Sequence, residues 1–205
     1  MVRRKISAVG GLVLAIALLV GSVPARAGEA QWADPAGDAT GLSAVESTPR
    51  PSEPQLDLLK VSYVGDGKNL TVASQVATLA DPVASGGAAY RWYWIYDGIT
   101  YELILQLPTP PTDTAFIRGP IFKGKGVTLE CGGCKARYDV KANTVGITIP
   151  ISAIARGVKT ASPSSPAFAA GAKLESLRSV SQRSMGAALV SVDFAVPKAG
   201  TSAGV

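Results

Sequence analysis

The sequence predicts an all-β protein, an antiparallel β-sandwich of roughly ten short strands. Two observations support this prediction. Short runs of β-branched and aromatic residues alternate with Gly, Pro, Asp and Asn turn signals, and no long stretch shows the apolar period of a helix. A parallel α/β sheet is excluded because it needs crossover helices between its strands. Immunoglobulin-like and jelly-roll connections of the strands both remain open.

Residues 1–27 are typical of a secretory signal peptide. Basic residues at 3–5 precede an apolar run at 11–20, and Ala25-Arg26-Ala27 is an A-x-A cleavage site. The apolar run is too short to span a bilayer comfortably, and no later stretch replaces it. We therefore predict cleavage near Ala27, no transmembrane anchor after it, and a secreted or cell-envelope location.

The charge of the chain gives no sign of a nucleic-acid partner. The net charge of +5 belongs mostly to the export signal, which holds four basic residues and no acidic one. The remainder carries 16 basic against 15 acidic residues, a net charge of +1. No stretch of it gathers Lys or Arg on one face, so nucleic-acid binding is not expected.

The exported part divides into three segments. Residues 28–54 are rich in turn formers and predict a loop-rich N-terminal segment, with one short edge strand near Gln31 and Trp32. Residues 55–196 predict the sandwich, which begins with strands at 56–64 and 69–79 joined by a turn at 65–68. Residues 197–205 predict a flexible tail.

The strongest local signal is a hairpin at 91–107. Asp97-Gly98 fits a two-residue type I′ turn, which needs positive φ at both positions. This turn predicts the pairs Tyr96–Ile99, Trp94–Tyr101 and Trp92–Leu103. One face of the hairpin is then apolar and aromatic. We expect it to be the sandwich core. The alternative is a stacking platform for sugar rings, whose candidate residues are Trp92, Trp94, Tyr96, Tyr101 and, in the N-terminal segment, Trp32.

The second half predicts four more short strands, at 114–122, 127–131, 135–140 and 144–149. One helical turn follows at 151–154. Residues 157–172 lose all periodicity and are rich in Ser, Pro, Ala and Gly, which predicts a long loop. Strands at 173–182 and 187–196 close the domain.

The residue content argues against an enzyme. The chain has no His, which excludes Ser-His-Asp and Cys-His nucleophiles, His general bases and most zinc hydrolase sites. A carboxylate pair for glycoside hydrolysis is the remaining alternative. The acids, however, lie mainly at turns, where turn chemistry alone explains them. We therefore predict a binding protein without catalytic residues.

Cys131-Gly132-Gly133-Cys134 predicts a structural disulfide. Gly-Gly suits a tight hairpin loop, which places the two Cys opposite each other at disulfide distance. Redox activity is less expected because a reactive C-x-x-C starts a helix. A metal site would need two further ligands.

Several short pieces resemble a known family. They are DPAGD (34–38), PQLDLLKVSY (54–63), ARYDVKANTVGITIPISAI (136–154), GAKLESL (171–177) and VSVDFA (190–195). Together with the aromatic hairpin they resemble secreted bacterial DOMON-like domains, relatives of the family-nine carbohydrate-binding modules. The resemblance implies a β-sandwich that binds sugars or haem, in some members with calcium. Haem is not expected here, because no His is present and Met185 alone cannot supply both axial ligands.

Four acidic residues inside these pieces are candidate calcium ligands: Asp34, Asp38, Asp57 and Asp193. Ca²⁺ binds several converging carboxylate and carbonyl oxygens. Asp34 and Asp38 flank a Pro-Ala-Gly turn, and the first and last strands of a sandwich are often neighbours. The alternative is ordinary turn formation with solvated charge. Calcium is the one cofactor that the sequence suggests.

These observations predict an exported, non-catalytic binding module for carbohydrate or a cell-envelope polymer. The alternative from another class is a structural or protein-interaction domain of the envelope that has no small ligand.

Overall fold

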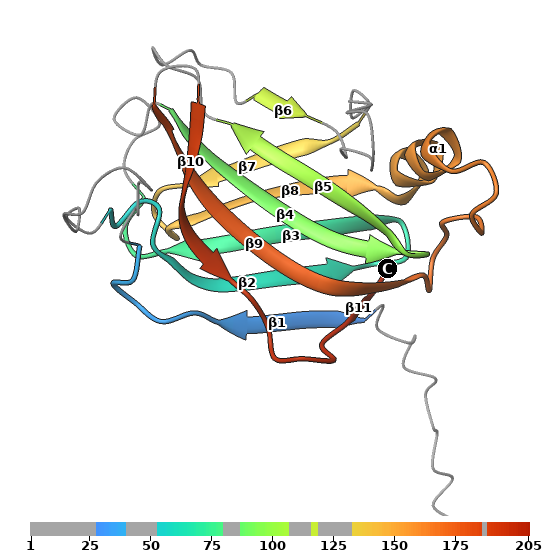
Figure 1. The fold of residues 1–205 in the computed structure, drawn as a ribbon, viewed down its shortest axis with the longest axis horizontal. Coiled ribbons are helices and arrows are strands. Elements are labelled where there is room, and N and C mark those ends of the chain that lie inside the picture. The colour runs from blue at the N-terminus through green and yellow to red at the C-terminus, as the bar shows by residue number, and fades with distance from the viewer. Residues whose placement is uncertain (1–27, 40–52, 80–86, 107–115, 119–132, 186–187) are drawn as a thin grey trace, which may run out of the picture.

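The computed structural model describes residues 28–39, 53–79, 87–106, 116–118, 133–185 and 188–205. The predicted signal peptide, the predicted strand at 127–131 and Cys131 lie outside these residues. The described chain forms two antiparallel sheets packed face to face, with one short helix beside them (Figure 1). This arrangement confirms the predicted all-β sandwich.

One sheet has five strands in the order β1-β2-β3-β8-β7. Its members are β1 (Glu29–Ala33), β2 (Leu58–Gly65), β3 (Asn69–Val76), β8 (Thr144–Pro150) and β7 (Lys135–Asp139). The predicted edge strand near Trp32 is β1, which pairs only with β2 among the described strands. Buried and more exposed residues alternate along β3, as expected of a strand with one face in the core.

The other sheet has the order β10-β9-β4-β5-β6, and the short β11 pairs with the start of β9. Its members are β10 (Ala188–Ala195), β9 (Lys173–Met185), β4 (Ala88–Tyr96), β5 (Ile99–Gln106), β6 (Phe116–Arg118) and β11 (Ala203–Gly204). In Figure 1 this six-stranded sheet lies in front of the five-stranded one.

The central hairpin, β4–β5, has the predicted turn and register. Asp97 and Gly98 have φ values of 49° and 71°, as a type I′ turn requires. Tyr96 pairs with Ile99, Trp94 with Tyr101 and Trp92 with Leu103.

The aromatic face of this hairpin is the core of the sandwich. Trp92, Trp94 and Tyr101 are fully buried. Trp92 Nε1 donates a hydrogen bond to Ser74 Oγ of the opposite sheet at 3.0 Å, and Ser74 Oγ is 3.1 Å from Ser179 Oγ. These three aromatic rings are therefore unavailable to a sugar, and the platform interpretation is wrong for them.

The helix α1 (Ile151–Ala161) is longer than the single turn predicted at 151–154. It begins directly after Pro150 and buries Ile154 and Val158. Apolar residues at this spacing lie on one face of a helix. Gly157 and the Ser residues after Ala161 led the sequence analysis to predict a loop there, although the apolar helical spacing continues to Val158. The long loop predicted at 157–172 accordingly starts only after Ala161. No helix in the described ranges is long and apolar enough to cross a membrane.

The C-terminal segment differs from the predicted flexible tail. Ala203 and Gly204 pair with Leu174 and Lys173 of β9. The N–H of Val205 donates to the carbonyl of Ala172 at 3.2 Å, and the Val205 side chain is buried. Small residues allow this close packing, since a side chain at Gly65 would collide with the backbone of Val205. Gly, Ala and Ser carry little strand signal in sequence, so the prediction failed here.

Candidate functional site

The structure brings three of the four predicted calcium ligands together. One carboxylate oxygen from each of Asp34, Asp38 and Asp193 lies within 4.8 Å of the other two. We call these three residues the aspartate cluster. Asp34 directly follows β1, Asp38 follows the next turn, and Asp193 lies in β10 of the other sheet. The cluster therefore joins the two sheets where β10 packs against β2.

A β-bulge directs Asp193 into this position. The pairing of β10 with β9 shifts by one residue between Ser191 and Asp193, which makes Val192 the extra residue. Val192 and Asp193 are both buried, whereas regular alternation would turn one of them outward. The Oδ2 atom of Asp193 accepts a hydrogen bond of 2.7 Å from the backbone N–H of Leu58, at the start of β2.

The turn between Asp34 and Asp38 is held by Asp57. Gly37 has a φ of +84°, in the left-handed region that favours glycine. Its N–H donates to Asp57 Oδ2 at 2.9 Å. Asp57 is outside the group of oxygens within 4.8 Å of one another. It therefore supports the turn and adds negative charge beside the cluster.

Two buried carboxylate oxygens at this place have no hydrogen-bond partner among the described residues. They are Asp57 Oδ1 and Asp34 Oδ2. Asp57 is only 3% exposed. A buried acceptor without a partner costs about 1–3 kcal/mol, and more when the group is charged. A bound cation would give Asp34 Oδ2 a partner and would offset the charge of Asp57, whose carboxylate is not among the three converging ones.

Burial and neighbouring carboxylates dominate the electrostatics of Asp34 and Asp193. Burial raises the pKa of Asp34 to about 7, with further increases from the charges of Asp193, Asp38 and Asp57. Burial likewise raises the pKa of Asp193, although the N–H groups of Leu58 and Phe194 lower it. No lysine or arginine is among the causes of either shift. The folded protein thus holds several carboxylates in mutual repulsion.

The geometry of the cluster fits calcium. Ca²⁺ binds six to eight oxygens at roughly 2.3–2.6 Å, so two oxygens on one ion are at most about 5 Å apart. The three carboxylate oxygens satisfy this limit. Water and backbone carbonyls usually complete such a shell. One Ca²⁺ would neutralise two of the charges that now repel each other.

The two remaining aromatic candidates do not form a platform either. Trp32 is half-buried and stacks on Tyr63, with ring centroids 5.7 Å apart. Tyr96 is half-buried and meets Phe168 edge to face at 4.9 Å. Trp32 belongs to the five-stranded sheet and Tyr96 to the six-stranded one. They offer no continuous row to a sugar chain.

The predicted disulfide stays a prediction. Cys134 directly precedes β7, but its predicted partner Cys131 lies outside the described residues.

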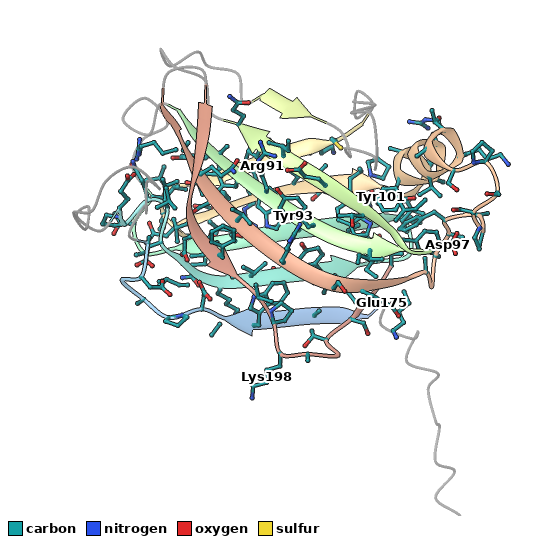
Figure 2. The ribbon with its side chains drawn as sticks, in the orientation of Figure 1. Arg91, Tyr93, Asp97, Tyr101, Glu175 and Lys198 are labelled. Atoms are coloured by element: carbon teal, nitrogen blue, oxygen red, sulfur yellow. The ribbon has the colours of Figure 1, made fainter. Side chains whose placement is uncertain are left out.

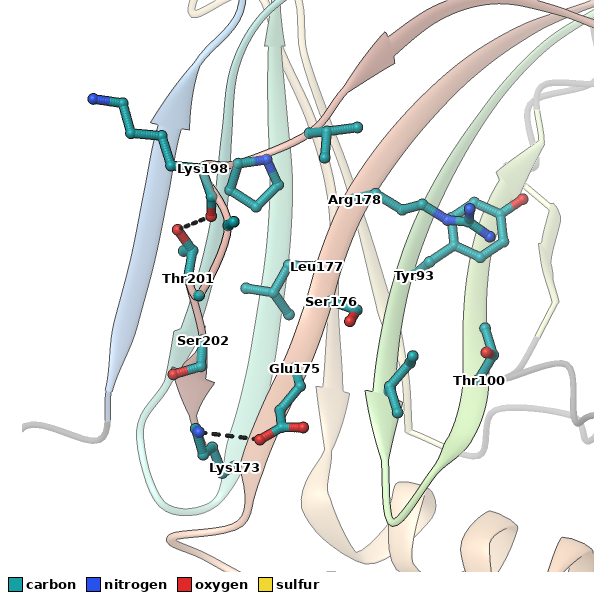
Figure 3. Close-up of a pocket in the computed structure, with 15 residues that line it drawn as sticks. Tyr93, Thr100, Lys173, Glu175, Ser176, Leu177, Arg178, Lys198, Thr201 and Ser202 are labelled. Atoms are coloured by element: carbon teal, nitrogen blue, oxygen red, sulfur yellow. Dashed lines mark hydrogen bonds and ion pairs between the residues drawn. The ribbon is translucent and has the colours of Figure 1, made fainter.

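A groove of about 720 Å³ lies on the outer face of the six-stranded sheet. Its floor comes from β4, β5 and β9, and its wall is the C-terminal segment 196–202 (Figure 3). Figure 2 marks Tyr93, Glu175 and Lys198 around it. The sequence interpretation missed this groove, because its wall belongs mainly to the segment expected to be a flexible tail. The signal that was present is the polar outer row of the hairpin, with Tyr93 and Thr100.

No protein-family model, curated protein or solved structure matches this chain.

Proposed function

We propose that this protein is an exported, non-catalytic binding module that holds a calcium ion at the aspartate cluster. One observation carries the proposal. Three carboxylates from distant parts of the chain converge beside the buried, unpartnered Asp57 Oδ1, and no cationic side chain is among the causes that raise the pKa of Asp34 and of Asp193. A divalent cation with oxygen ligands is the partner that such a site favours.

The ion would act on structure rather than on a reaction. Asp34, Asp38 and Asp193 would bind it directly, and Asp57 would hold the turn that carries Asp38. The ion would thereby fasten the N-terminal segment and β10 to the start of β2. An ion that binds only the folded state raises the free energy of unfolding.

Thermal unfolding with calcium and with chelator tests the proposal. Calcium at a hundredfold excess over its dissociation constant adds about 2.7 kcal/mol to the free energy of unfolding. For a chain of this size we expect Tm to rise by roughly 5–10 °C. Magnesium at the same concentration should raise Tm less, because it demands shorter distances and keeps its water. Equal Tm values with calcium and chelator would contradict the proposal.

A second candidate function is binding of carbohydrate or a cell-envelope polymer. The outer groove, with its Ser and Thr hydroxyl groups, favours it, and the resemblance to DOMON-like domains agrees with it. The competing proposal is a structural or protein-interaction domain without a small ligand. Retention of the protein by a polysaccharide supports the first, and failure of every polymer tested supports the second.

A further inference from the structure

The floor of the outer groove contains a second β-bulge. The pairing of β9 with β4 shifts by one residue between Tyr93 and Ile95. Ser176, inside this bulge, has a φ of +50°, a conformation that costs non-glycine residues energy. Strained backbone of this kind persists only where the surroundings enforce it, often at ligand sites.

The bulge changes which side chains face the groove. Leu174 and Leu177 are buried, whereas Glu175 and Ser176 are both exposed. In a regular strand Ser176 would point inward like Leu174, because side chains alternate between the two faces. The extra residue therefore places two consecutive polar side chains in the groove, next to Arg178 (Figure 3).

The opposite sheet supports the bulge from inside the core. The hydroxyl of Tyr63 is shared between the carbonyl oxygens of Tyr93 and Arg178, each 2.9 Å away. The bulge is thus held by a buried tyrosine of the opposite sheet.

The groove carries an excess of positive charge. The Arg178 guanidinium lies over the Tyr93 ring, 4.3 Å from its centroid, and forms no ion pair with a described carboxylate. Lys173 pairs with Glu175 at 3.0 Å. Lys198 stands at the rim on the C-terminal wall (Figure 3). The Lys198 side chain points away from the groove floor and Lys173 is paired with Glu175, so Arg178 is the cation over the floor that has no ion pair with a described carboxylate (Figure 3).

We propose that this groove binds an acidic polysaccharide, a chain of sugars that bear carboxylate groups. The proposal rests on the carbohydrate or polymer binding put forward above and names its site and ligand class. Arg178, oriented by Tyr93, would pair with a sugar carboxylate, which matches the fork of a guanidinium. The Ser176 and Thr100 hydroxyl groups would bind sugar hydroxyl groups. From Lys173 to Arg178 the floor extends roughly 16 Å along β9, longer than one sugar ring.

Three soluble polymers distinguish this ligand class in a calorimetric titration with chelator present. Polygalacturonate has sugar rings and carboxylates, dextran has sugar rings alone, and polyacrylate has carboxylates alone. Chelator removes calcium, so the result is independent of the aspartate cluster. We expect polygalacturonate to bind at least tenfold more tightly than either of the others.

Two variants and one control variant test whether polygalacturonate binds in the outer groove. Arg178→Gln should weaken polygalacturonate binding about tenfold, the loss typical of a hydrogen bond between charged groups. Ser176→Gly should weaken it severalfold without unfolding the protein, because glycine adopts positive φ freely. Lys60→Gln removes one exposed charge from the other sheet and should leave the affinity unchanged.

Four other results of these titrations would contradict the inference, and each identifies the part that is wrong. Equal affinity for dextran would keep carbohydrate binding but remove the acidic ligand class. Equal affinity for polyacrylate would reduce the effect to net charge. Unchanged affinity in Arg178→Gln would move the ligand to another surface. Absence of binding to all three would remove polymer binding as well, while the calcium proposal would stand.

Discussion

Asp34 carries the strongest titration effect of the aspartate cluster. Burial raises its pKa from an ordinary value of 3.8 to about 7, so the folded state binds more protons between these values. The contribution of Asp34 to the free energy of unfolding of the calcium-free protein therefore falls as pH rises from about 4 to 7. The raised pKa of Asp193 acts in the same direction.

Thermal unfolding in chelator between about pH 4.5 and 7.5 checks this expectation. Tm should be higher at the acidic end, and saturating calcium should reduce the difference. Because the chain has no His, no side chain has an ordinary pKa between about 5 and 8. Asp34→Asn should flatten the profile, whereas Asp97→Asn, an exposed turn residue, should keep it. A calcium-free Tm that rises with pH would contradict the role given to Asp34.

The aspartate cluster could be predicted only in part from the sequence. Asp34 and Asp38 are close in sequence and flank a turn, so their proximity could be foreseen. The position of Asp193 depends on the Val192 bulge, which no local signal marks. Asp57 was expected to be a ligand as well; its Oδ2 accepts a hydrogen bond from the N–H of Gly37, and it is not among the three carboxylates that converge within 4.8 Å.

Among the elements, the β4–β5 hairpin provides the largest buried aromatic surface. Trp94 is fully buried and stacks on Tyr101 with centroids 6.0 Å apart. Trp94→Ala should therefore lower the free energy of unfolding by about 3–5 kcal/mol, the range for truncating a buried aromatic. Urea unfolding measures this change. The matched control is Phe194→Ala, because Phe194 is 58% exposed and its truncation should cost little. A loss below about 1 kcal/mol for Trp94→Ala would place its ring outside the core.

The same hairpin explains which elements the sequence predicts well. Asp97-Gly98 and the alternating residues on either side decide its turn and register locally. The β-bulges in β9 and β10 and the strand β11 were missed, because each exists only through contacts with distant segments. Ala203, for example, is a strand residue because Leu174 lies opposite it.

At the scale of the whole molecule, the sheets are assembled from segments far apart in sequence. Leu70 of β3 pairs with Ile149 of β8, and Arg91 of β4 pairs with Val180 of β9. Turn signals and alternation predict a sandwich, but they contain no information about such pairings. The sequence therefore does not predict the order of the strands. It does not predict the outer groove either, because β4, β5, β9 and the C-terminal segment come together only in the folded sheet.

The aspartate cluster also brings together segments that are far apart in sequence. It joins the end of β1, the turn that follows β1 and the final long strand, β10. A bound ion would fasten segments separated by more than 150 residues. Calcium should therefore affect the stability of the whole domain and not only that of the N-terminal segment.

A direct calcium titration by calorimetry tests this central claim most closely. We predict one ion bound per chain by the unsubstituted protein and by Asp97→Asn. Asp34→Asn and Asp193→Asn should each lose this binding or weaken it at least tenfold, because each removes a charged ligand. Asp34→Asn should still fold, since it also removes repulsion from the calcium-free state. Absence of calcium binding, or equal binding by all four proteins, would contradict the account.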